Sequence, residues 1–194
     1  MLNRVKILVV GDIIGKGARN AFIRYLPILK EKYNYDIICI NAENTTHGRG
    51  MNYKHYLAYN QLGINVMTMG NHVVDNKEIY DYIDKTNNLV VPGNVKYDSD
   101  VFEAHKEVNV EFNGYNIKFV NLIGTSTVKE PLVANNPLEY FDKQYNEDSN
   151  SISPFFISGK SGEPNNFSVH STILSYWSFA LLKYLTSITS WQQV

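Results

Sequence analysis

The first half of the chain alternates short apolar runs with segments of helical periodicity. Four apolar runs predict buried strands at residues 5–11, 36–40, 66–69 and 89–91. Between them, apolar residues spaced three and four apart predict helices at residues 18–33, 52–62 and 76–85. Pro27 lies inside the first helix and is expected to kink or break it. This order of elements is typical of βα units built around a parallel sheet.

After Pro92 the alternation of strand and helix stops. Residues 107–112 and 115–122 alternate apolar and polar positions on either side of Asn113-Gly114, which is a strong hairpin signal. The sequence therefore predicts an α/β fold, a layered sandwich in which parallel βα units are followed by an antiparallel hairpin.

Residues 151–194 differ sharply in composition from residues 1–150. Ten of the 13 serines lie in this last part, and its only charged residues are Lys160, Glu163 and Lys183. We therefore predict one main domain over residues 1–150 and a serine-rich, charge-poor tail over residues 151–194 that is not an independent domain. Within the tail, residues 158–166 have the composition of a flexible loop, and residues 173–185 fit a helix ambiguously.

The bulk composition excludes several classes of protein. The net charge of −1 gives no general attraction to nucleic acid or to a membrane surface. The single cysteine, Cys39, lies in an apolar run, so we expect a small buried side chain and no internal disulfide. No stretch reaches the roughly 18 uncharged apolar residues of a membrane span, and the N-terminus lacks the features of a signal peptide. These features predict a cytoplasmic location.

Polar side chains follow three successive predicted strands. Asp12 follows the first apolar run, Asn41-Ala42-Glu43-Asn44 follows the second and Asn71-His72 follows the third. In open α/β sheets, functional sites form outside the carboxyl ends of the strands. Carboxylate, carboxamide and imidazole groups are suitable ligands for hard divalent cations and for iron or manganese. One carboxylate can bridge two ions that clamp a phosphoryl group, while an imidazole supplies the proton for the leaving oxygen.

Simpler explanations exist for each of these residues taken alone. Asp and Asn after strands commonly cap the next helix, so Asp12 fits capping equally well, and for Asn71-His72 alone a structural role is favoured. Repetition at three strand ends favours a site. A rival motif, residues 11–17, is similar to a phosphate loop, but it is one residue short and has Gly17 where a serine or threonine would hold magnesium.

The other histidines carry weaker signals. His47 lies in a glycine-containing loop just after Glu43 and is a candidate substrate contact. His55 and His105 lie among polar residues, so we expect both to be solvated.

With these residues assembled, the chain resembles the YmdB-type metallophosphoesterases, a branch of the calcineurin-like superfamily. The resemblance covers about residues 4–125 and rests on Gly11-Asp12-x-x-Gly15, Asn41-Ala42-Glu43-Asn44 with Gly48-x-Gly50, Gly70-Asn71-His72, and Asn121-Leu122-Ile123-Gly124. Ordinary calcineurin-like enzymes carry Asp-x-His at the first strand and an aspartate at the second. The Glu-Asn pair in this chain is the feature of the branch.

The resemblance implies a two-metal phosphodiesterase in which a metal-activated hydroxide attacks a phosphoester such as a 2′,3′-cyclic nucleotide. Asp12, Glu43 and Asn44 would hold one iron or manganese ion. Glu43 would bridge to a second ion, which Asn71 would also hold. His72 would be the proton donor or a stabiliser of the transition state.

The chain departs from the family pattern in its second half. Family members continue with His-Ala-Glu and Gly-Thr-His-Thr-His segments that supply three further histidine ligands, and neither segment occurs here. The resemblance ends near residue 150, which fits a frameshifted or truncated product, or real divergence. We therefore expect an incomplete second half, doubtful metal occupancy and impaired activity. The alternative is a non-catalytic fragment acting as an interaction module, whose uncovered apolar sheet edge would favour association with a second copy.

Overall fold

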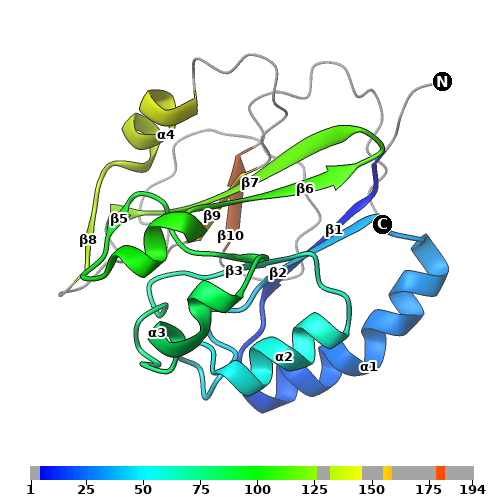
Figure 1. Ribbon diagram of the computed structural model, residues 1–194. Helices are drawn as coiled ribbons and strands as arrows, with labels where there is room; N and C mark the ends of the chain where they lie inside the picture. Colours follow the sequence, from blue (N-terminus) through cyan, green and yellow to red (C-terminus); the bar gives the residue numbers. More distant parts are fainter. Residues whose placement is uncertain (1–4, 126–131, 146–154, 159–177, 182–194) are drawn as a thin grey trace.

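The computed structural model describes residues 5–125, 132–145, 155–158 and 178–181 of the 194-residue chain (Figure 1). Its first sheet contains four parallel strands, whose order in space is the same as their order in the sequence. The strands are β1 (Ile7–Asp12), β2 (Ile37–Asn41), β3 (Val66–Thr68) and β4 (Leu89–Val90). The carboxyl ends of β1, β2 and β3 are therefore neighbours.

Helices cover one face of this sheet (Figure 1). They are α1 (Gly15–Tyr33), α2 (Tyr53–Gln61) and α3 (Ile79–Tyr82), the last continuing as the 3-10 helix η1 (Ile83–Lys85). Alternate residues of β2, Ile38 and Ile40, belong to a core that includes Leu26 of α1 and Tyr59 of α2. No helix among the described residues combines the length and apolar character that a membrane crossing requires.

A second sheet covers the other face of the first. Its strands are β6 (Glu107–Phe112), β7 (Tyr115–Ile123), β9 (Phe155–Ser158) and β10 (Ser178–Leu181), in the order β10-β9-β7-β6. The predicted hairpin between β6 and β7 is confirmed, with Phe112 paired to Tyr115. Asn113 and Gly114 both have positive φ, 51° and 79°, as a tight two-residue hairpin turn requires.

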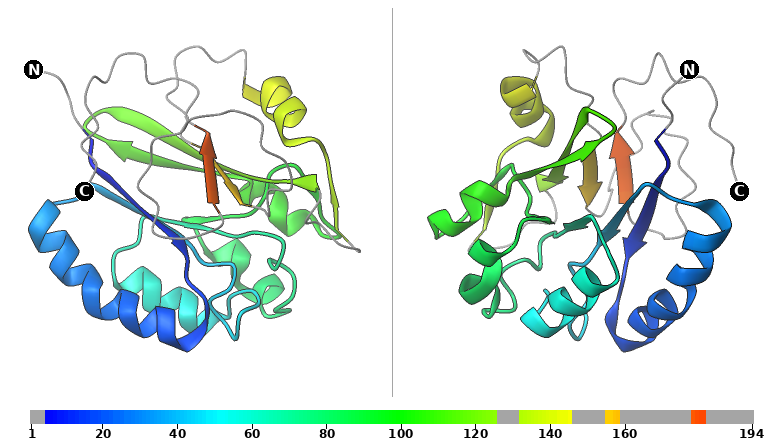
Figure 2. Two further views of the ribbon diagram at one scale, coloured as in Figure 1. Left: turned by 180° about the vertical axis from the view of Figure 1, so that it is seen from behind. Right: turned by 45° about the vertical axis from the view of Figure 1, so that its right-hand side comes forward.

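Figure 2 shows the second sheet on the side of the first sheet opposite the helices. The two sheets pack on each other through alternate residues of β2. Ile37 and Cys39 join Val108, Ile117 and Phe119 of the β6–β7 hairpin in one buried cluster. Cys39 is thus the buried side chain that the sequence predicts. The predicted fold class, a layered α/β sandwich of parallel βα units followed by an antiparallel hairpin, is confirmed.

Helix α4 (Pro137–Tyr145) lies on the outer side of the second sheet. Its Tyr140 and Phe141 pack on Val120 and Leu122 of β7. A short two-stranded sheet of β5 (Val95–Lys96) and β8 (Val133–Ala134) and the 3-10 helix η2 (Asp100–His105) complete the described elements.

Several local expectations were wrong. Helix α1 begins at Gly15 and continues through Pro27 without a break. Pro27 has no N–H to donate to the carbonyl of Ile23, but both residues lie on the solvent side of the helix, where water can replace that bond. His105 is buried rather than solvated, because the end of η2 lies beside β4, where the Val91 backbone N–H donates to the His105 carbonyl at 2.8 Å. Residues 178–181 form strand β10 instead of part of a helix.

Most of the predicted tail lies outside the described residues, including residues 159–166 of the predicted loop at residues 158–166. The described part of the tail is limited to the strands β9 and β10. The division at residue 150 stays a prediction.

Asn94 joins the second sheet to the loops beside it. Its side chain is fully buried, accepts from the Ile123 backbone N–H at 2.9 Å, and donates to the carbonyls of Ile123 and Asn135, each at 2.8 Å. All three partners are backbone groups, so loss of the Asn94 carboxamide leaves them without these hydrogen bonds.

We predict that Asn94→Ala lowers the free energy of unfolding by about 2–4 kcal/mol, because it leaves buried backbone groups without partners. The matched control is Asn109→Ala on the exposed face of β6, expected to change stability by no more than about 0.5 kcal/mol. Urea unfolding followed by circular dichroism measures both variants. Equal stability of the two variants would contradict the role given to Asn94.

Candidate functional site

The three predicted strand ends meet at one edge of the first sheet. In the register of the parallel strands, Asp12 of β1 lies beside Asn41 of β2, and Asn41 lies beside Thr68 of β3. The chain turns directly after each strand, so Glu43-Asn44 and Asn71-His72 follow at the same edge. The structure therefore brings together the side chains that the sequence singled out.

Asp12 and Asn44 are in direct contact across the ends of β1 and β2. The Asn44 carboxamide Nδ2 donates to Asp12 Oδ2 at 2.6 Å. The other oxygen, Asp12 Oδ1, is buried and has no hydrogen-bond partner among the described residues. Burial raises the pKa of the Asp12 carboxyl, while the hydrogen bond from Asn44 and the nearby His72 act in the opposite direction.

The Glu43 carboxyl occupies the space left by the missing side chain of Gly70. A Cβ added at Gly70 would overlap Oε2 and Cδ of Glu43 and would lie 2.9 Å from Oε1. Glu43 is only 8% exposed, and its Oε2 lacks a hydrogen-bond partner within the described part of the chain. Gly70 therefore fixes the position of this carboxyl at the ends of β2 and β3.

The surroundings of Glu43 disfavour its ionised form. Burial is the largest cause and the Asp12 carboxyl is the second, and together they raise the pKa of Glu43 from 4.5 to about 7. Three hydrogen bonds lower this pKa: one involves the Asn41 side chain, and two involve the backbone of Asn71 and His72. Asn71 and His72 therefore lie close to the Glu43 carboxyl. Glu43 thus lies between groups from the first and third strands.

His72 faces the site from the turn after β3. Its effect on the pKa of Asp12 places the imidazole near the strand ends. The ring nitrogen Nδ1 contacts Asp75 Oδ2 at 2.8 Å. Asp75 was not among the predicted site residues, although its position three residues after His72, between the third predicted strand and the next predicted helix, was the available signal.

The loop that follows Asn44 carries His47. His47 is exposed and has φ 54°, and the glycines at positions 48 and 50 also have positive φ. A Cβ on Gly50 would lie 3.0 Å from the His72 carbonyl oxygen, so this loop packs directly on the turn after β3. His55 is partly buried against the same loop, where its Nδ1 contacts the Thr46 hydroxyl at 2.7 Å, so full solvation of His55 was a wrong prediction.

The donor set fits a divalent cation. Two buried carboxylate oxygens without partners, Asp12 Oδ1 and Glu43 Oε2, are the groups that a bound cation would satisfy. Within the described ranges, no group of three or more His, Cys, Asp and Glu side chains has the spacing of a metal site. The set is therefore two carboxylates and the carboxamide of Asn44, with the backbone of Asn71 beside Glu43 and with His72 outside the set.

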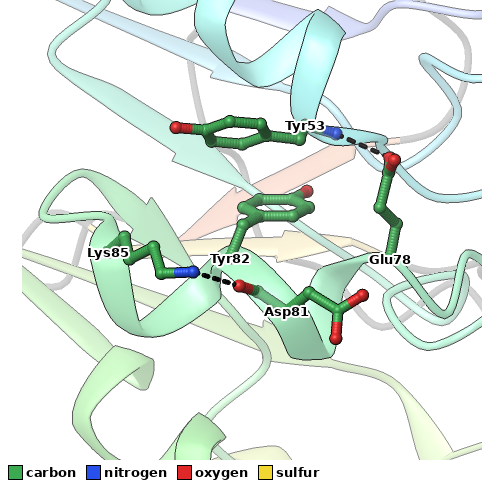
Figure 3. A pocket seen from close by; sticks show the side chains of 5 residues that line it. All are labelled: Tyr53, Glu78, Asp81, Tyr82 and Lys85. Carbon is green, nitrogen blue, oxygen red and sulfur yellow. Dashed lines mark hydrogen bonds between the residues drawn. The ribbon is translucent and has the colours of Figure 1, made fainter.

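The cavity in Figure 3 lies elsewhere, between α2 and α3. It measures about 260 Å³ and is lined by Tyr53, Glu78, Asp81, Tyr82 and Lys85. The rings of Tyr53 and Tyr82 lie 5.3 Å apart, and the Tyr53 backbone N–H donates to the Glu78 carboxylate at 2.9 Å. No strand-end side chain lines this cavity, so it is not the candidate site.

Comparisons with known proteins identify the family that the chain matches. Residues 8–158 match the protein family described as YmdB-like. A 2′,3′-cyclic-nucleotide 2′-phosphodiesterase of Bacillus subtilis is 38% identical over 120 residues, which are 62% of this chain and 44% of that protein. A Mycoplasma genitalium protein named provisionally as a phosphatase/phosphodiesterase is 36% identical over 137 residues, 70% of this chain and 48% of that protein.

The fold comparison agrees with the sequence comparison. The crystal structure of a phosphatase from Mycoplasma pneumoniae superimposes with a TM-score of 0.73 and 32% identity, covering 83% of this chain and 57% of the other. The chain spans about half the length of the curated relatives it matches.

We predict that Gly70→Ala displaces the Glu43 carboxyl and weakens divalent-cation binding, because the added methyl group overlaps Oε2 and Cδ. The matched control is Gly17→Ala in α1, where an added Cβ meets nothing within 4 Å. Isothermal titration with Mn²⁺ compares both variants with the unmodified chain. We expect weaker binding only for Gly70→Ala, and unchanged affinity in that variant would show that Glu43 is not held as described.

We also predict that Glu43 makes the cation-free chain less stable as the pH rises. Because its folded pKa of about 7 exceeds the ordinary 4.5, the folded chain holds this proton more tightly, and the free energy of unfolding falls between these two pH values. The full loss is roughly 3 kcal/mol.

Urea unfolding in a chelating buffer tests this stability effect. Glu43→Gln should have nearly the stability of the unmodified chain near pH 4.5 and exceed it above pH 7. If Glu43→Gln is no more stable than the unmodified chain above pH 7, the result would contradict the burial of an ionisable group at this position.

Proposed function

Because the chain belongs to the YmdB-like protein family, we propose that its strand-end site hydrolyses phosphoesters with the help of divalent cations. The observation that carries this proposal is the pair of buried, unpartnered oxygens, Asp12 Oδ1 and Glu43 Oε2, at adjoining strand ends. Carboxylate oxygens without partners are suitable ligands for a divalent cation.

Contacts at the strand ends support the proposed ligands. Asp12, Glu43 and Asn44 would hold one ion, and Glu43 and Asn71 would hold a second. The oxygen-rich donor set suits manganese or iron, as the family resemblance implies. When bound, such cations act as Lewis acids that withdraw charge from a phosphoryl group and activate water.

The chain's own residues supply the remaining functions. We assign His72 as the proton donor to the leaving oxygen, because its imidazole lies near Asp12 without being part of the carboxylate pair. The exposed His47, on the loop that packs against the His72 turn, is the proposed substrate contact. A small phosphoester, such as the cyclic nucleotide named for the Bacillus subtilis relative, is the proposed substrate class.

Activity of this chain by itself is proposed to be impaired. The sequence lacks the His-Ala-Glu and Gly-Thr-His-Thr-His segments that the resemblance leads one to expect, and the remaining carboxamide ligands are neutral. The second cation would therefore be held weakly. The cytoplasmic location and association between copies also stay predictions.

The alternative of a non-catalytic interaction module is favoured by one feature. Helix α1 exposes large apolar side chains, namely Ile23, Tyr25 and Ile28, each more than 40% accessible.

We predict that Glu43→Gln weakens Mn²⁺ binding on the order of 100-fold and abolishes the Mn²⁺-dependent hydrolysis of bis(p-nitrophenyl) phosphate. The matched control is Glu31→Gln on the exposed side of α1, which makes the same chemical change away from the site. Isothermal titration and release of p-nitrophenolate give separate readouts.

Mn²⁺ binding that survives Glu43→Gln would overturn the proposed ligand set. Binding without hydrolysis in the unmodified chain would leave the metal site in place and favour the non-catalytic alternative for this chain.

A further inference from the structure

A side chain outside the proposed site is paired with His72. Asp75 Oδ2 lies 2.8 Å from His72 Nδ1, and the Asp75 backbone N–H donates to the His72 carbonyl at 3.2 Å. The same two residues are thus joined twice, once through the backbone turn and once through their side chains. This double link restricts both the turn and the rotation of the imidazole.

The pairing determines which ring nitrogen is available. An ionised carboxylate can only accept hydrogen bonds, so Nδ1 of His72 must be the donor to Asp75. The hydrogen therefore stays on Nδ1, and Nε2, on the opposite edge of the ring, is left for another partner. The imidazole is also near enough to Asp12 to lower the pKa of that carboxyl.

The turn is supported from two sides. The glycine loop touches it at Gly50, whose added Cβ would lie 3.0 Å from both the His72 carbonyl oxygen and Asn76 Cβ. Asn76 in turn accepts through Oδ1 from the Glu78 backbone N–H at 3.1 Å, which ties the end of the turn to the start of α3. The position of Asp75 is therefore set by packing as well as by its bond to His72.

We propose that Asp75 is the positioning residue for His72, holding the imidazole in the Nδ1–H form with Nε2 directed to the leaving oxygen. This inference rests on the proposed function. As a water oxygen forms its bond to phosphorus and gives up its proton to solvent, the bond from phosphorus to the leaving oxygen breaks, and the doubly protonated His72 ring transfers its Nε2 proton to that oxygen. The ring becomes neutral with its hydrogen on Nδ1, still bound to Asp75, and solvent returns the proton to Nε2.

A purely structural role for the pair makes a different prediction. The side chains of His72 and Asp75 are 30% and 33% exposed, and ion pairs exposed to this degree contribute little to stability. Loss of the Asp75 carboxylate should therefore alter the ring and the chemistry of His72 much more than the stability of the fold. The tests are chosen to separate these effects.

The first test reads the imidazole directly and needs no activity. Nitrogen-15 NMR of the full chain in alkaline buffer, where imidazole rings are neutral, reports which nitrogen of His72 carries the hydrogen. The His72→Gln variant assigns the signal. We expect the Nδ1–H form in the unmodified chain and in the control Asp81→Asn, and a shift toward the Nε2–H form in Asp75→Asn.

The second test uses the leaving group. With Mn²⁺ present, Asp75→Asn should lower kcat for a 2′,3′-cyclic nucleotide, whose alkoxide needs a proton, by about 100-fold. For bis(p-nitrophenyl) phosphate, whose leaving group needs little protonation, kcat should change by less than about threefold. Asp75→Glu should restore part of the loss, and Asp81→Asn should behave like the unmodified chain.

The outcomes separate the two proposals. An identical His72 ring spectrum in Asp75→Asn and the unmodified chain overturns the positioning role, and so does an equal loss of kcat on both substrates. If the unmodified chain hydrolyses neither substrate, the proposed function fails for this chain, and the ring spectrum alone decides whether Asp75 positions His72.

Discussion

The burial of the Glu43 carboxyl against Gly70 is the constraint on which the candidate site depends. An ionised carboxylate without partners inside a protein costs several kcal/mol, so the group must be neutralised by a proton or by a cation. Without a cation the proton prevails up to neutral pH, because burial and Asp12 raise the pKa of Glu43 to about 7. A divalent ion would replace that proton and satisfy the unpartnered Oε2.

The second sheet helps to hold Gly70 in place beside the Glu43 carboxyl. Asn121 of β7 is fully buried, and its side-chain nitrogen donates to the carbonyls of Met69 and Val90. Met69 immediately precedes Gly70, so the residue that makes room for Glu43 is held by a strand more than 50 positions away in the chain. Packing between the two sheets thus determines the geometry at the edge of the first sheet.

The parts predicted correctly from the sequence depend on local patterns. Apolar periodicity defined the strands of the first sheet, and Asn113-Gly114 defined the hairpin, because both signals arise within a few residues. The meeting of Asp12, Glu43 and Asn71 followed from the parallel order of the strands. Contacts set by tertiary packing could not be predicted in this way: the space at Gly70, the burial of His105 and the tolerance of Pro27 all depend on which side of an element faces the core.

The six residues from Gly70 to Asp75 contribute both to the proposed cation binding and to the proposed proton transfer. Gly70 gives space to the Glu43 carboxyl, Asn71 lies beside that carboxyl, and His72 is tied to Asp75. Asp12 and Asn44, by contrast, are joined by a side-chain hydrogen bond across the ends of β1 and β2. A displacement of the turn after β3 would therefore disturb cation binding and proton transfer together, whereas a change at Asp12 or Asn44 would act on the cation first. Because Gly50 packs on this turn and Asn121 bonds to Met69 just before it, the fold itself couples the two halves of the proposed chemistry.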